Sequence, residues 1–200
     1  MWVILGRPRP FRSKPRAPVF VHALLCLRFL ATIQAAGDAD SVRRQLAAYQ
    51  RVPAPTALDF AWPYLDSPDS DLREAARKAV QAQPFAQWKE RALEEKNTWA
   101  SLEILRALTE SCPRGEAAAL SPHLCEQIST LRLEAMDPAQ LRAAIRLTRL
   151  VFDRLGPVSE DERQQMVDAW SHLPPPTDAP AATDWRALLE FLRAVHSRRL

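Results

Sequence analysis

Glycine is scarce in this sequence, which holds only Gly6, Gly37, Gly115 and Gly156 in 200 residues. Few glycines and few runs of β-branched residues argue against a protein built from β-sheets. The sequence also contains no G-x-S-x-G, G-x-G-x-x-G or P-loop motif, so nothing indicates a nucleophile elbow or a phosphate-binding loop. We therefore expect a helical protein that is not an enzyme, with no catalytic residue and no cofactor.

Cysteine is also rare, and Cys26, Cys112 and Cys125 form neither C-x-x-C nor C-x-x-C-H. This excludes a disulfide framework and covalent haem attachment, and it is typical of small core residues. Cys112, His123 and Cys125 are the one cluster with metal-ligand residue types. His123 and Cys125 point to different sides of a helix, and a fourth ligand is missing, so we predict no metal site.

The acidic residues form no catalytic or calcium-binding pattern. Asp66, Asp69 and Asp71 lack the glycine and the final bidentate glutamate of a calcium loop, and we interpret them as turn and cap residues. Glu94 and Glu95 lie close to basic residues and are interpreted as a solvated helix end.

The formal net charge of +3 does not describe the helical body. Five of the 27 basic residues and no acidic residue fall in residues 1–16, namely Arg7, Arg9, Arg12, Lys14 and Arg16. The remaining 22 basic residues face 24 acidic ones over residues 17–200, which gives a charge of −2. A nucleic-acid-binding protein carries its positive charge on the folded surface, so this distribution makes nucleic acid an unfavoured partner.

The first 36 residues divide into two segments. Residues 1–18 are basic and proline-rich without an apolar period, and we predict a disordered tail. Residues 19–36 are apolar and resemble a secretory signal, but Arg28 interrupts the run. The alternative is a first amphipathic helix, and the stretch is too short and polar for a membrane span. Both a cytoplasmic and an exported location therefore stay open.

The stretch from Trp62 to Glu110 organises the rest of the chain. Leu72, Ala76 and Val80 recur with helical spacing, whereas Arg73 and Arg77 are assigned to the opposite, solvent-facing side. We expect Asp69 to cap this helix and Asn97 to cap the next one. Similar patterns predict helices over 38–50, 56–65 with a kink at Pro63, 71–82, 98–110, 121–131, 138–155, 159–170 and 184–197.

These capped helices predict an all-α fold, a short irregular α-solenoid of HEAT-like helix pairs over residues 38–200. A weak internal repeat supports this, because DLREAARKAV at 71–80 aligns with QLRAAIRLTR at 140–149 and more loosely with DSVRRQLAAY at 40–49. Residues 171–183 read as a proline-rich linker before the last helix.

Two patterns identify a resemblance: the run Ala75-Ala76-Arg77, and Gln83-Pro84 followed by Gln87-Trp88 and Arg91-Ala92-Leu93. Residues 38–197 resemble the HEAT-like helical region of large exported proteins from planctomycete-type bacteria. In that family the region lies between a β-propeller related to sugar dehydrogenases and a c-type cytochrome module. The propeller and the haem signature are absent here, so the resemblance implies a helical spacer or a fragment of a larger redox protein, with no catalytic residue to transfer.

The expected function is a non-catalytic scaffold or protein–protein interaction module. Arg142, Arg146 and Arg149 form a basic stripe on one helix, and Trp99 falls outside the apolar arc of its own helix, so these side chains are the candidate interaction surface. The alternative is a nucleic-acid-binding helical array that uses this stripe and the basic tail.

The C-terminal helix suggests a further contact. Trp185, Leu188, Leu189 and Leu192 share one face, while Phe191 is expected to point away from it. Leu173, Phe191 and Leu200 would then be exposed apolar side chains that another surface has to bury, since terminal units of a solenoid require a polar outer face. We therefore expect weak self-association or partner binding through this end.

We predict that the N-terminal tail is dispensable for stability. Residues 1–18 have no apolar face to bury, so ordering them would cost conformational entropy without compensation. A chain that lacks them should melt at the same temperature as the full chain within experimental error. A large drop in melting temperature would show that the tail docks on the folded body.

Overall fold

The computed structural model describes residues 39–155 and 159–194, and every regular element within them is a helix. The predicted all-α fold is confirmed. The chain divides into two compact units, residues 1–41 and 42–200. The predicted segments 1–18 and 19–36 lie outside the described residues, and the second unit is considered by itself below. None of the described helices combines the length and the apolar character needed to cross a membrane.

Residues 39–49 are helical, and the α-helices and 3₁₀ helices (η) that follow are short. They are α2 (Ala57–Ala61), η1 (Trp62–Asp66), α3 (Ser70–Gln81), η2 (Phe85–Gln87), α4 (Lys89–Leu93), α5 (Thr98–Ser111), α6 (Ala117–Thr130), η3 (Leu133–Ala135), α7 (Pro138–Arg154), α8 (Glu160–Ser171) and α9 (Ala179–Ala194).

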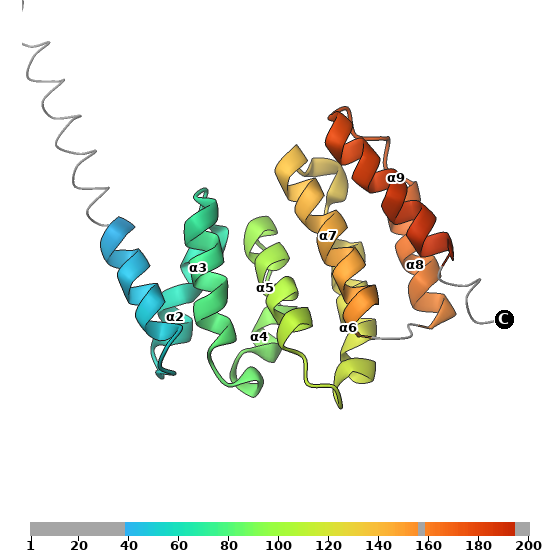
Figure 1. Ribbon diagram of the computed structural model, residues 1–200. Coiled ribbons are helices and arrows are strands. Elements are labelled where there is room, and N and C mark those ends of the chain that lie inside the picture. The colour runs from blue at the N-terminus through green and yellow to red at the C-terminus, as the bar shows by residue number, and fades with distance from the viewer. Residues whose placement is uncertain (1–38, 156–158, 195–200) are drawn as a thin grey trace, which may run out of the picture. The chain divides into compact units, whose positions relative to one another are not determined.

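The helices of the second unit lie in two layers (Figure 1). We call the helical residues 42–49 together with α3, α5, α7 and α9 the front layer, and α2, α4, α6 and α8 the back layer. In the front layer α3 contacts α5, α5 contacts α7, and α7 contacts α9. The chain therefore alternates between layers, and helices far apart in sequence become neighbours.

Caps and prolines set most helix starts as predicted. The Asp69 carboxylate accepts hydrogen bonds from the backbone N–H groups of Asp71 and Leu72, and Asp137 forms a full capping box with Gln140. Pro63 ends α2 and lies in the first turn of η1. The Ser159 hydroxyl caps α8 by accepting a hydrogen bond from the Glu162 N–H, without the return bond that would complete a capping box. The Glu162 carboxylate instead accepts a hydrogen bond from Ser121 Oγ, at 3.1 Å.

One predicted cap and two predicted helix starts differ from the structure. Asn97 precedes α5 but makes no side-chain cap. Helix α6 begins at Ala117, before Pro122, because three successive alanines favour helix and Pro122, the sixth residue of α6, removes only the hydrogen bond of its own missing N–H. Helix α9 begins at Ala179 within the expected linker 171–183, since proline fits the first turn and Asp178 accepts a hydrogen bond from the Ala181 N–H.

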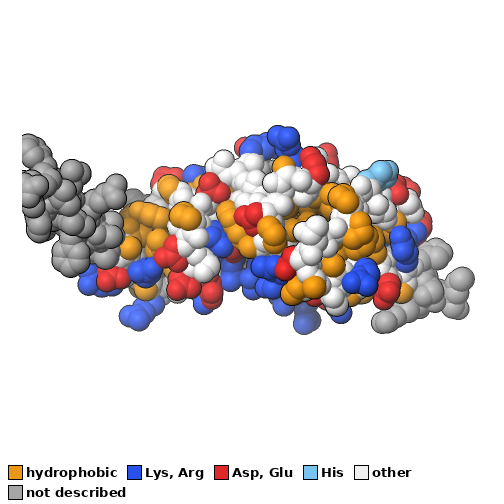
Figure 2. All heavy atoms as spheres, turned by 90° about the horizontal axis from the view of Figure 1, so that it is seen from above, with side chains coloured by type: hydrophobic (Ala, Val, Ile, Leu, Met, Phe, Trp, Pro, Cys, Tyr) orange, Lys and Arg blue, Asp and Glu red, His pale blue; other side chains and the backbone are white. Residues whose placement is uncertain are grey.

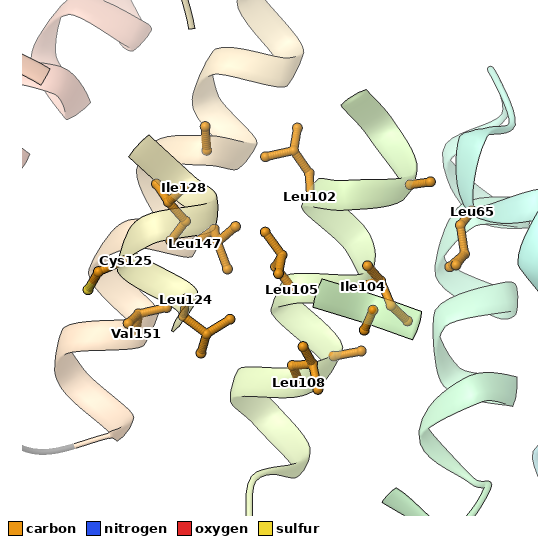
Figure 3. Close-up of a cluster of buried hydrophobic side chains, with 14 of the residues drawn as sticks. Leu65, Leu102, Ile104, Leu105, Leu108, Leu124, Cys125, Ile128, Leu147 and Val151 are labelled. Carbon is orange, nitrogen blue, oxygen red and sulfur yellow. The ribbon is translucent and has the colours of Figure 1, made fainter. Parts of the chain in front are cut away.

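The hydrophobic core runs continuously between the layers (Figure 3). Where α5, α6 and α7 meet, fully or almost fully buried side chains converge: Leu102, Leu105, Leu108, Leu124, Ile128, Leu147 and Val151. Ile104 is also buried but lies on the other side of α5, toward Leu65. Trp88 and Trp170 are fully buried at 0% exposure and fill the largest spaces. Apolar burial of this extent is the main stabilising term of the fold.

We predict that Leu105→Ala is strongly destabilising, because Leu105 lies between the layers at 2% exposure. Losing the buried methyl groups and leaving a cavity should lower the free energy of unfolding by about 2–5 kcal/mol. Leu72→Ala is the matched control, since Leu72 is only half-buried and should cost less. Urea unfolding of both variants measures the difference, and equal losses would contradict the assigned core.

Candidate functional site

Arg73 and Arg77 of α3 are buried, not solvent-facing as the sequence pattern predicted. Only 7% of Arg73 and 5% of Arg77 are exposed. The assignment was wrong because α5 packs directly against this side of α3 and brings acidic side chains to both guanidinium groups. Buried charges persist when they are paired in this way.

Two glutamates of α5 hold Arg77. Arg77 Nη1 donates a hydrogen bond to Glu110 Oε2 at 2.6 Å, and Arg77 Nε lies 3.2 Å from Glu103 Oε2. The second contact is electrostatic, because this Nε forms no aligned hydrogen bond. Gln81 Nε2 and Arg106 Nε also donate to Glu110, at 2.8 Å each. Glu110 thus joins α5 to α3 through two donors, Arg77 and Gln81, and accepts a third hydrogen bond from Arg106 of its own helix.

Hydrogen bonding determines the pKa of Glu110. Burial alone would raise that pKa, but the hydrogen bonds from Arg106 and Gln81 and the charge of Arg77 outweigh it. The pKa of Glu110 therefore lies below its ordinary value of 4.5. The carboxylate is ionised at neutral pH and balances the buried arginines.

Trp99 falls outside the apolar arc of α5, as expected, and it has an internal partner. The Arg73 guanidinium carbon lies 3.7 Å from the centroid of the Trp99 ring, a close cation–π contact. The same guanidinium donates to the backbone carbonyls of Ser67 and Pro68. Trp99 is half-buried and still borders open space.

That open space is a groove of about 460 Å³ between α3, α5 and α7. Half of its lining residues are apolar: Trp99, Leu102, Ala139, Ala143, Leu147 and Leu150. The other half are charged: Arg73, Glu103, Arg106, Glu110, Arg142 and Arg146. We call this space the front groove. In Figure 2 the front layer lies along the lower edge of the view, where Lys and Arg side chains gather.

The predicted arginine stripe divides into two environments. Arg142 and Arg146 line the front groove with Trp99. Arg142 Nη1 lies 2.8 Å from Asp178 Oδ2, whereas Arg146 is exposed and forms no hydrogen bond or ion pair within the described part of the chain. Arg149 lies outside the groove, 3.8 Å from Asp153.

One kind of ion pair recurs along the front layer. Arg43 Nη2 lies 2.6 Å from Asp69 Oδ2 at the start of α3, as Arg142 does from Asp178 at the start of α9. Helices α3 and α5 are joined by the hydrogen bonds and ion pairs of Glu110. The contact between α5 and α7 differs, because no ion pair joins these two helices among the residues described. The front groove lies between them.

Phe191 does not point away from the packed surface as expected. Its ring meets the Phe152 ring of α7 edge to face, with 6.2 Å between centroids, and the Arg149 guanidinium lies 5.3 Å from the Phe191 centroid. This contact partly covers the side chain on which the expected self-association depended. Leu173 also packs against the core, and Leu200 lies outside the described residues.

The cysteines show no activation. Burial raises the pKa of Cys125 to about 12, with the charge of Glu162 adding to the effect, and burial also raises the pKa of Cys112. Both thiols are therefore protonated at neutral pH. No three His, Cys, Asp or Glu side chains gather as a metal site within residues 39–155 and 159–194. Cys26 lies outside them.

Glu95 is not the solvated residue that was predicted. Its carboxylate accepts a hydrogen bond from Trp62 Nε1 at 2.7 Å and from the N–H groups of Lys96 and Asn97. Burial would raise the pKa of Glu95, but these hydrogen bonds together hold it below 4.5. Glu95 thus orders the turn before α5 and ties η1 to it.

No protein-family model matches this sequence, and searches of curated proteins and of solved structures return no match either. The resemblance to the planctomycete-type helical region therefore stays a prediction.

Sequence reasoning found Trp99, Arg142 and Arg146 but not the residues that complete the groove. Glu103, Arg106 and Glu110 are not among the predicted interaction residues. One signal was present: Glu103 and Glu110 are seven residues apart, which is about two helical turns and places both on one side of α5.

We predict that Glu110→Gln weakens the acid dependence of stability. The folded pKa of Glu110 is lowered, so its stabilising contribution is complete above the unfolded value of 4.5 and is lost as the pH falls through the folded pKa. The variant should be less stable at neutral pH, and its free energy of unfolding should fall less steeply below pH 4.5 than that of the wild type.

Urea unfolding at a series of pH values tests this expectation. Glu126→Gln is the control, because Glu126 is exposed on α6 and forms no side-chain ion pair among the described residues. Parallel curves for wild type and Glu110→Gln would contradict the assigned role of Glu110.

Proposed function

We propose that the two layers form a short HEAT-like α-solenoid that binds another protein and carries out no reaction. The alternation of front and back helices supports this architecture, because each helix pair covers the apolar side of the next. The aligned segments 71–80 and 140–149 both belong to front-layer helices, α3 and α7. In that alignment Arg142 corresponds to Arg73 and Arg146 to Arg77.

The front groove is the observation that carries the binding function. It is concave, half apolar and half charged, and it contains the exposed Arg146, which has no partner among the described residues. Protein interfaces combine apolar contact with arginine in this way. The family resemblance adds a setting, in which the solenoid acts as a spacer or fragment of a larger redox protein.

A protein partner is favoured over a nucleic acid by the pairing of the arginines. Arg142 and Arg149 are each paired with an aspartate, which leaves Arg146 as the member of the stripe without a partner in the described residues. Tight binding to a phosphate backbone needs several unneutralised cations in a row. The apolar lining would also stay unused by a phosphate backbone, whereas a protein side chain can bury it.

A photo-crosslinking amino acid at position 146 tests the proposed function. After irradiation in an extract of the source cells, we expect a covalent adduct that protease removes and nuclease does not. A crosslinker at position 126 is the matched control, because Glu126 is equally exposed but lies on α6 in the back layer. The adduct should form at position 146 and not at position 126.

Two outcomes would overturn the proposed function. An adduct that nuclease removes would indicate a nucleic-acid partner, and it would support the alternative array. The absence of any adduct from position 146, with a crosslinker shown to be reactive, would indicate that the front groove binds no macromolecule in that extract.

A further inference from the structure

The chain itself contains a comparison for Arg146. Its counterpart in the repeat alignment is Arg77, which two carboxylates of α5 satisfy, at 2.6 Å from Glu110 and 3.2 Å from Glu103. Arg146 occupies the aligned place on α7 and has no carboxylate within the described residues. Helix α3 thus presents this arginine paired with carboxylates, whereas α7 presents it without a partner among the described residues.

The surroundings of Arg146 also lack internal acids that are free to reach it. Glu110 is held by Arg77, Gln81 and Arg106, and Glu103 lies beside Arg73 and Arg77. With these carboxylates committed, the charges open to a ligand in the groove are positive. Arg106 also lines the groove, and 50% of its side chain is exposed although it donates a hydrogen bond to Glu110.

Apolar side chains lie next to these cations. Ala139, Ala143, Leu147 and Leu150 form one face of α7 toward the groove, and Leu102 lies opposite on α5. A space of about 460 Å³ holds a few side chains and not a folded domain. A ligand that fits must therefore carry both a negative group and a small apolar group close together.

We propose that the front groove binds an acidic segment of a partner protein, with a carboxylate on Arg146 and an adjacent aliphatic side chain on the α5 and α7 floor. This rests on the proposed function and names the chemistry of its partner. The carboxylate takes the role toward Arg146 that Glu103 and Glu110 take toward Arg77. Charge-assisted hydrogen bonds of arginine with carboxylate supply affinity, and the narrow floor supplies selectivity for small side chains.

Fluorescence anisotropy with three labelled probes tests this inference. The first probe is a short synthetic peptide of glutamate, leucine and serine, and the second is identical except that glutamine replaces glutamate. The third is single-stranded oligodeoxythymidine of similar length. We expect the acidic peptide to bind, the glutamine peptide to bind at least about tenfold more weakly, and the affinity to fall with added salt.

A pair of variants locates the site. Arg146→Glu should weaken binding of the acidic peptide by about tenfold or more. Arg186→Glu is the matched control with the same charge change, because Arg186 is exposed on α9 in the front layer but does not line the groove. It should leave the affinity within about twofold, and circular dichroism shows that both variants stay folded.

Three results would overturn the inference. They are no binding of the acidic peptide, an equal loss in Arg146→Glu and Arg186→Glu, and tighter binding of oligodeoxythymidine than of the peptide. The crosslinking experiment separates this failure from that of the proposed function. Suppose that a nuclease-resistant protein adduct forms at position 146 but the acidic peptide does not bind. The proposal of a protein partner would then stand, and the proposal that an acidic segment of it fills the groove would fail.

Discussion

The contact between α3 and α5 depends on a buried ionic cluster in which Arg77 meets Glu103 and Glu110. Removing one member of such a cluster leaves an uncompensated charge in the interior and costs about 3–5 kcal/mol. The two helices are consequently fixed in one register, since sliding either by a turn would separate the charges. That register places Trp99 under Arg73 and forms one wall of the front groove.

Local patterns were sufficient for the helical class and for most helix positions. The Asp69 and Asp137 caps and the effect of Pro63 act over a few residues, so the sequence contains their whole cause. The start of α9 differs because Pro180 belongs to the stretch predicted as a proline-rich linker, although proline in a first turn leaves no hydrogen bond unmade.

The groove was only partly predictable, for a reason that concerns tertiary contacts. Helical periodicity sorts residues by polarity, so it placed Arg73 and Arg77 on the solvent side. Whether a charged side chain is buried depends on the acids that a neighbouring helix brings, and those are set by packing. Trp99 was found because it departs from the apolar arc of its helix, and the α7 arginines because like charges recur along one helix face, whereas Glu103 and Glu110 show neither signal.

The missing ion pair between α5 and α7 has a mechanical consequence. In the described front layer ion pairs join the other neighbouring helices, whereas α5 and α7 are held by buried apolar side chains and by a hydrogen bond from Arg154 Nη2 to the Glu110 carbonyl, at 2.9 Å. No ion pair among the described residues therefore resists a change in the angle between these two helices. A ligand bound in the front groove would therefore fix the angle between α5 and α7, and with it the direction of the helices that follow α7.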